Sequence, residues 1–219
     1  VNRLNFKAIE YIRVAKSSEA KKYVEEAITL ANNIKFEKGL ASSYSILGDI
    51  YDINSNFKVQ LDYYSKALEI NQRIGNRADI ADNLISMGKV NYFHLSDHSK
   101  ALDYFLKALE INESLDNKLS IAENLEGIGL VYSFTKNYTK ALEYYQKALS
   151  LNEELEDKYG ISDNLECIGL VYANMAEHEK ALVYFKKALI IDEQLDKKAS
   201  SAVELCCIGT AYYNLNDYP

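Results

Sequence analysis

The sequence predicts an all-α fold, an α-solenoid of antiparallel helical hairpins, from three observations. Its 219 residues are 48% hydrophobic but include one proline and nine glycines, too few for a β-fold with many tight turns. Apolar residues recur at helical spacing along most of the chain. A repeat near 40 residues, typical of solenoids, links five glycines at steps of 40, 41, 40 and 40: Gly48, Gly88, Gly129, Gly169 and Gly209.

Each repeat unit is predicted to be two helices. In the fourth unit, one apolar stripe runs over 122–132 and a second over 141–155, with a polar break at 135–137. Polar or glycine pairs at 75–76, 116–117, 156–157 and 196–197 separate consecutive units and suit helix ends. The units in order are 1–40, 41–80, 81–121, 122–161, 162–201 and a truncated sixth, 202–219, that has a first helix only.

Seven positions of each unit carry a motif of bulky, leucine-like, small, tyrosine, small, aromatic and small residues. The fourth unit reads Leu125, Ile128, Gly129, Tyr132, Ala141, Tyr145 and Ala148. The fifth reads Leu165, Ile168, Gly169, Tyr172, Ala181, Phe185 and Ala188. This pattern resembles the tetratricopeptide repeat over the whole chain, in the 40-residue variety of bacterial signalling proteins. The resemblance implies a right-handed superhelix and a protein-interaction role.

Departures from the motif are few and local. Gln60 stands where the other units have alanine, and Asn91 stands in place of tyrosine, beside a one-residue insertion between Gly88 and Lys100. The first unit is divergent and is expected to act as a cap. The truncated sixth unit leaves an apolar face without a hairpin partner, so we expect a longer natural chain and end-to-end self-association through this helix.

Recurring polar and aromatic residues have a structural interpretation. Tyr23, Tyr63, Tyr104, Tyr144 and Tyr184 are expected to pack in the core and between repeats. Asn83, Asn124 and Asn164 suggest a ladder of hydrogen bonds between repeats. Lys66, Lys107, Lys147 and Lys187 are expected on a solvated outer face.

Charge and composition exclude several partner classes. The 32 acidic and 25 basic residues give a net charge of −7, which argues against nucleic acid. No apolar run is long enough to insert into a membrane, and no signal peptide is visible, so we expect a cytoplasmic protein. The three cysteines, Cys167, Cys206 and Cys207, have no zinc-binding spacing and are expected to be free thiols, with Cys167 and Cys207 buried.

Catalytic and metal chemistry is not expected. The chain has no glycine-rich phosphate loop and no arrangement of nucleophile and base, and we predict no enzyme activity and no cofactor. His94 and His98 have no third metal ligand nearby other than Asp97, so all three are expected to be solvated loop residues.

The resemblance places a partner-binding groove on the first helices of the units. Its positions map onto a mostly acidic set with apolar residues between the acids, which predicts a basic, partly apolar peptide or helix as the partner. Phe93 is a further apolar member of this surface. The candidate groove residues are Asp49, Asp52, Asp82, Ile85, Lys89, Glu123, Glu126, Leu130, Phe134, Asp163, Glu166 and Leu170.

Other interpretations stay open at this point. Asp82, Glu123 and Asp163 fall in first turns of helices, where a carboxylate stabilises the helix dipole without any ligand. The array could also be a structural spacer or a self-association element. A third alternative is the regulatory part of a peptide-controlled enzyme.

Overall fold

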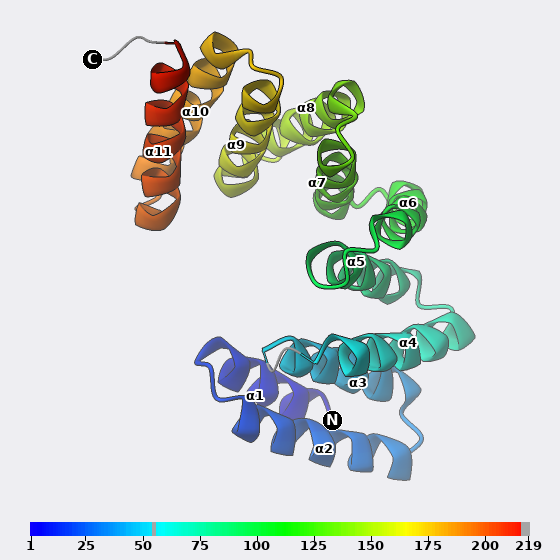
Figure 1. Ribbon diagram of the computed structural model, residues 1–219. Coiled ribbons are helices and arrows are strands. Elements are labelled where there is room, and N and C mark those ends of the chain that lie inside the picture. The colour runs from blue at the N-terminus through cyan, green and yellow to red at the C-terminus, as the bar shows by residue number, and fades with distance from the viewer. Residues whose placement is uncertain (54–55, 216–219) are drawn as a thin grey trace. The chain divides into compact units, whose positions relative to one another are not determined.

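The computed structural model describes residues 1–53 and 56–215, which form eleven α-helices and no strand (Figure 1). The predicted all-α fold is therefore confirmed. In chain order the helices are α1 (Asn2–Arg13), α2 (Ser17–Asn33), α3 (Glu37–Ile53), α4 (Phe57–Ile74), α5 (Arg77–Phe93), α6 (His98–Ser114), α7 (Lys118–Phe134), α8 (Tyr138–Glu154), α9 (Lys158–Asn174), α10 (His178–Gln194) and α11 (Lys198–Leu215).

Short turns with a left-handed residue end most of these helices. Gly75, with φ of 69°, follows α4. Comparable left-handed residues in the other turns have side chains. The next helix then starts with a cap: the side chains of Asn117 and Asn137 accept hydrogen bonds from the backbone N–H groups of Ser120 and Lys140. The polar breaks expected at 75–76, 116–117, 156–157 and 196–197 all lie at such turns.

The chain forms two compact units, residues 1–111 and 112–219, and α6 crosses the boundary between them. In the N-terminal unit α1 packs on α2 and α3 on α4; in the C-terminal unit α7 packs on α8 and α9 on α10. The first helices of successive hairpins also touch, α1 with α3 and α7 with α9. We call the surface of α3 and α5, and that of α7, α9 and α11, the first-helix face of the respective unit.

Helices within a hairpin approach closely because a glycine on one helix faces an aromatic ring on the other. A Cβ atom added to Gly129 would lie 2.7 Å from the Tyr145 ring, nearer than real side chains approach. Gly48, Gly88 and Gly169 face the rings of Tyr64, Phe105 and Phe185 in the same way. The recurring small residues therefore serve close helix packing, as the motif predicts.

A second ring pair joins the two helices of several hairpins. Tyr51 stacks on Tyr63 with ring centres 5.4 Å apart, and Tyr132 stacks on Tyr144 at 5.6 Å. The pairs Tyr11–Tyr23 and Tyr172–Tyr184 repeat this geometry. The expectation that the recurring tyrosines are packing residues is confirmed for these pairs, which lie within a hairpin.

Candidate partner-binding surface

Acidic side chains gather on the first-helix face of the N-terminal unit. Asp49 and Asp52 lie one helical turn apart on α3, and both are exposed to solvent. The Tyr64 hydroxyl donates a hydrogen bond to Asp49 Oδ1 over 2.7 Å. Removal of water by surrounding protein atoms raises the pKa of Asp49, and the Tyr64 hydrogen bond opposes this shift. Asp52 Oδ1 lies 3.1 Å from His94 Nε2.

Two adjoining hollows lie at these carboxylates. One is lined by Asp49, Asp52, Gln60, Tyr64, Ser86, Lys89, Val90, Phe93 and His94. The other is lined by Ile9, Ser42, Ser45, Ile46, Asp49, Tyr64, Asp79, Asp82, Asn83 and Ser86. The predicted groove residues Asp82 and Lys89 are exposed on α5 and line one hollow each.

The expectation that Ile85 belongs to the partner-binding groove is wrong. Ile85 was expected as an apolar foothold for the partner, but its side chain is only 4% exposed. Because α5 packs against α4, this position faces the core instead of the solvent. Phe93, at the end of α5, is 58% exposed and supplies the apolar surface there.

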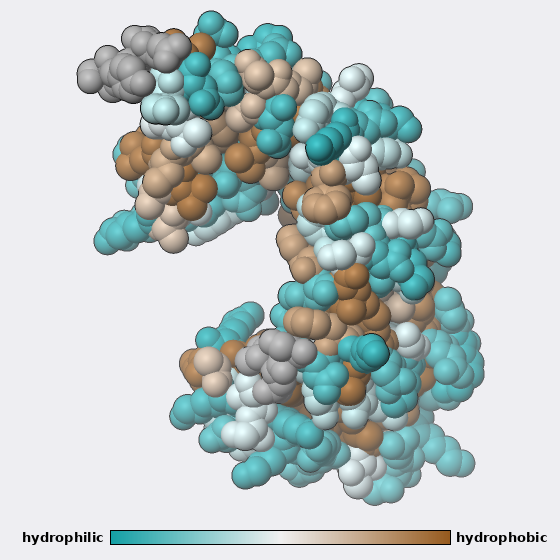
Figure 2. All heavy atoms as spheres, viewed as in Figure 1, coloured by the Kyte–Doolittle hydropathy of each residue, from teal (hydrophilic) through white to brown (hydrophobic). Residues whose placement is uncertain are grey.

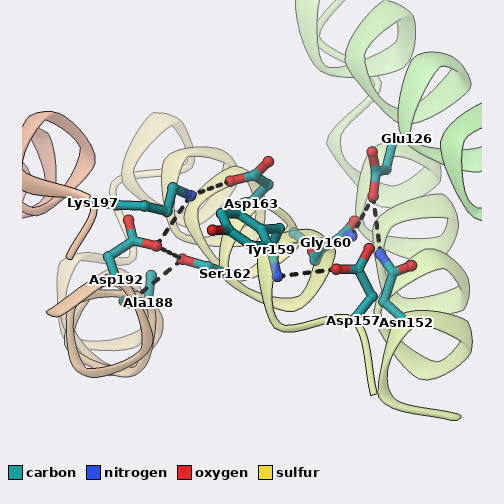
Figure 3. Close-up of polar contacts among 11 residues, drawn as sticks. Glu126, Asn152, Asp157, Tyr159, Gly160, Ser162, Asp163, Ala188, Asp192 and Lys197 are labelled. Atoms are coloured by element: carbon teal, nitrogen blue, oxygen red, sulfur yellow. Dashed lines mark hydrogen bonds and ion pairs between the residues drawn. The ribbon is translucent and has the colours of Figure 1, made fainter. Parts of the chain in front are cut away.

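In the C-terminal unit, Glu126 of α7 is held by two amides (Figure 3). Its Oε1 accepts hydrogen bonds from Asn152 Nδ2 of α8 at 3.1 Å and from Asn164 Nδ2 of α9 at 2.6 Å. Burial raises the pKa of Glu126, and the two amide donors oppose the shift. Glu126 therefore joins three helices, so its role is structural as well as electrostatic.

The other predicted groove residues of this unit differ in how far they are exposed to solvent. Asp163 is exposed and pairs with Lys197 Nζ at 2.9 Å, while Glu123 and Glu166 are half-buried. Leu130 is half-buried against the core of α8 and α9. The open apolar positions are Phe134, which is 58% exposed, and Leu170, which is 39% exposed.

The asparagine ladder between repeats is present in both units. In the N-terminal unit, Asn71 of α4 donates to Asn83 of α5, and Asn83 donates to Ser45 of α3. In the C-terminal unit, the link from Asn164 to Glu126 takes this place. Asn124, the third recurring asparagine, donates instead to the Ser120 carbonyl of its own helix, so the predicted ladder is confirmed at Asn83 and Asn164.

Acids replace these amides near the end of the C-terminal unit. Asp192 of α10 is buried; it accepts a hydrogen bond from Ser162 at 2.5 Å and lies 3.1 Å from Lys197 Nζ (Figure 3). Glu204 of α11 is 0% exposed, and neither carboxylate oxygen has a hydrogen-bond partner among the described residues. Burial, followed by the charges of Asp192 and Glu166, raises the pKa of Glu204 to about 7.

Sequence reasoning missed several residues that shape these sites. Gln60 departs from the alanine of the other repeats, and the repeat pattern assigns it no role. His94, expected to be solvated, stacks on Phe57 with ring centres 3.9 Å apart. Asp192 and Glu204 break a register of asparagines, which was a readable signal. Cys167 and Cys207 were expected to be buried, which is wrong: both are half-buried free thiols, and Cys206 is exposed.

Over residues 1–53 and 56–215, no group of three or more histidine, cysteine or acidic side chains is arranged to hold a metal ion. Within the same residues no helix has the length and apolarity needed to cross a bilayer.

Family models decide what kind of repeat this is. A tetratricopeptide repeat model matches residues 61–114, 79–154 and 120–194, and a second matches residues 41–73. The chain belongs to the tetratricopeptide repeat family. A search of curated proteins found no match to this sequence.

Solved structures show the same fold at low sequence identity. The apo form of RapI has a TM-score of 0.85 and 22% identity, with 96% of this chain and 77% of RapI covered. Aspartyl phosphate phosphatase F of Bacillus subtilis has a TM-score of 0.83 and 16% identity, covering 95% of this chain and 54% of the phosphatase. A signal transduction ATPase with a tetratricopeptide repeat sensor from Pyrococcus horikoshii has a TM-score of 0.82 and 19% identity, with 98% and 33% covered.

Proposed function

We propose that this tetratricopeptide repeat protein is a non-enzymatic interaction module that binds a basic, partly apolar segment of a partner protein on its first-helix face. The observation that carries the proposal is the acidic character of that face in each unit. Exposed or half-buried acids project from the first helices: Asp49, Asp52 and Asp82 in one unit, and Glu123, Asp163 and Glu166 in the other.

Several lysines on the second helices are paired with acidic side chains. On the second helices, lysines pair with acids one turn earlier, as in Lys66 with Asp62 and Lys147 with Glu143. A basic partner would therefore be attracted to the first-helix face, and the exposed rings of Phe93 and Phe134 would bury apolar surface on contact. Recognition by charge and shape needs no chemical step.

The structural neighbours support a signalling context for this proposal. A signal transduction ATPase with a tetratricopeptide repeat sensor and an aspartyl phosphate phosphatase have a similar fold; at 19% and 16% identity this similarity shows the fold alone. We place the protein in the cytoplasm as a sensing or scaffolding part of a larger bacterial signalling protein. Its three free cysteines agree with a reducing compartment.

Two matched double variants test the proposal. Glu123→Gln with Glu166→Gln removes two charges from the first-helix face, and Glu153→Gln with Glu193→Gln removes two exposed charges from α8 and α10. Glu126 is left unchanged because it holds Asn152 and Asn164. Partners captured from lysate would be identified, and peptides from them titrated by calorimetry.

The proposal predicts that the first variant binds at least tenfold more weakly and that its affinity depends no more steeply on salt than that of the original chain. The control variant should bind as the original does. Equal affinity of both variants for the identified segment, at equal helical content, would refute recognition on this face.

Self-association is a second candidate, favoured by two observations on α11. A Cβ added to Gly209 of α11 would meet nothing within 4 Å, whereas Gly129 faces a ring. Val203, Leu205 and Tyr213 of α11 are 47–65% exposed, and Figure 2 shows hydrophobic surface over this helix. Sedimentation at increasing concentration tests it: a constant monomer mass would rule out association through α11.

A further inference from the structure

The most unusual polar group of the N-terminal unit is Gln60, on the first turn of α4. The equivalent residues of the other repeats are alanines: Ala20, Ala101, Ala141 and Ala181, all 0% exposed. Gln60 is also buried, at 3% exposure, but it lines the hollow of about 330 Å³ beside Asp49 and Asp52. Its Oε1 atom accepts no hydrogen bond from any of the residues that the structure describes. A buried acceptor without a donor costs stability, so the site needs an explanation.

The neighbouring hydroxyl determines which way the Gln60 amide points. Tyr64 has one hydroxyl hydrogen, which it donates to Asp49 Oδ1 at 2.7 Å. Tyr64 can therefore only accept from Gln60, whose Nε2 lies 3.4 Å from the Tyr64 oxygen. This assignment leaves Gln60 Oε1 as the atom that lacks a donor.

The hollow thus presents acceptors to a ligand. Asp49 and Asp52 contribute carboxylates, and Gln60, whose unsatisfied amide oxygen is buried, also lines the hollow. Lys89 and His94 also line it; His94 pairs with Asp52, and the two carboxylates outnumber the single Lys89 ammonium. Asp79 and Asp82 line the adjoining hollow and add negative charge. A group that carries only donors and a positive charge is the chemical complement of this lining.

The shape of the lining separates the two cationic side chains. A guanidinium is planar, carries five N–H donors and stacks on aromatic rings, whereas an ammonium is a compact point charge. Phe93 lines the hollow with a ring that is 58% exposed. Several separated acceptors and an open ring face favour the planar group.

We infer that the hollow between α3, α4 and α5 is a pocket for an arginine side chain, with Asp49 and Asp52 as its carboxylate partners and Gln60 as a positioning residue at its base. The pocket rests on the proposed function, since the arginine would belong to the bound partner segment. The inference thus assigns an arginine to the partner segment and a specificity role to Gln60 of this chain.

The test uses the whole chain and a defined probe, N-acetyl-L-arginine methylamide, titrated by two-dimensional NMR. We expect millimolar affinity, with shifts centred on Asp49, Tyr64 and the Gln60 side-chain amide. The citrulline derivative, which has the same shape without the charge, should bind at least tenfold more weakly, and the lysine derivative should also be weaker. Equal binding of the citrulline derivative, or tighter binding of the lysine derivative, would overturn the inference.

Two variants use residues that this chain already tolerates in other repeats, which guards against misfolding. Asp49→Leu copies Leu130 and Leu170, and Gln60→Ala copies Ala101 and its equivalents. The first should raise the Kd of the arginine probe at least tenfold and the second about threefold. As a control, Glu153→Gln on the exposed surface of α8 should leave the Kd unchanged; the opposite ranking of the three variants contradicts the assignment.

The two proposals fail separately. Arginine binding in the pocket, without any partner whose affinity depends on Glu123 and Glu166, would overturn the proposed function and keep the pocket. A partner segment that binds through those acids, with no saturable arginine shift at Asp49, would overturn the pocket alone.

Discussion

The two junctions that helix α9 makes with its neighbouring repeats differ in their polar residues. At the junction with α7 and α8, Asn164 lies beside Glu126. One repeat later, at the junction with α10 and α11, the equivalent residues are Glu204 and Glu166. On the first side a single carboxylate receives two amide hydrogen bonds, from Asn152 and Asn164. On the second side Asp192 and Glu204 are both buried acids, and the nearby cation is Lys197, 3.1 Å from Asp192.

The two sides share a backbone register, so the difference comes from side chains alone. An amide can donate to a carboxylate, but a second carboxylate can do so only when it is protonated. The first junction is therefore satisfied at any pH where Glu126 is ionised. The second carries an unfavourable buried charge that protonation relieves.

The largest expected effect comes from making the first junction resemble the second. Asn164→Asp would remove donors to Glu126 Oε1 and to the Gly160 carbonyl and would place a buried charge beside Glu126. We expect the free energy of unfolding at pH 7 to fall by about 4 kcal/mol. Urea denaturation followed by circular dichroism measures it, and the loss should shrink at pH 4; a loss that is independent of pH would contradict the electrostatic explanation.

Two glycines that lie two repeats apart, Gly129 and Gly209, offer a second comparison. Gly129→Ala would push a Cβ to 2.7 Å from the Tyr145 ring, so we expect about 2 kcal/mol of destabilisation. Gly209→Ala meets no atom within 4 Å and should stabilise α11 by up to about 1 kcal/mol through helix propensity. Thermal unfolding of both variants provides the measurement. Equal effects at the two sites would mean that α11 is covered by a helix in solution.

The pH dependence of the second junction follows from Glu204. Its pKa is raised to about 7, mainly by burial, so the folded state holds the proton more tightly than the unfolded state. The contribution of Glu204 to the free energy of unfolding is therefore fully present below the pKa of the unfolded state, and it is lost as pH rises through about 7. Glu204→Gln, which restores an amide, should stabilise the protein by about 1 kcal/mol at pH 8 and have no effect at pH 4.

Melting temperatures measured across pH 4–8 for the original chain and this variant would show the difference, with Glu193→Gln on the exposed surface of α10 as the control. A stabilisation of the same size at both ends of the range would exclude titration of Glu204 as its cause.

The smallest effect concerns cysteines at equivalent positions of α9 and α11. Burial raises the pKa of Cys167 to about 12, and it also raises that of Cys207. Since the thiolate is the reactive form, iodoacetamide at pH 8 should modify exposed Cys206 first, Cys207 next and Cys167 last. Time-resolved mass spectrometry of the peptides gives the order. Modification of Cys167 before Cys207 would indicate that α9 is more open than α11.

Much of the fold was predictable because a repeat supplies several copies of the same evidence. The helix ends at 116–117 and 156–157, the glycine–ring contacts and the stacked tyrosines all follow from side-chain size and spacing at fixed phase. The family resemblance also directed attention to the first helices, where Asp49, Asp52 and Glu166 lie.

The sequence alone determined the helical hairpins and their register, because periodicity is a property of residues in order, and the family resemblance added the acidic set on the first helices. Only the tertiary structure decided that Ile85 is core, that Glu126 joins three helices, and that Gln60 lies at the base of an acidic hollow. Each of these depends on distances between side chains from different helices, and burial changes the energy of a polar group according to the donors and acceptors that packing places beside it.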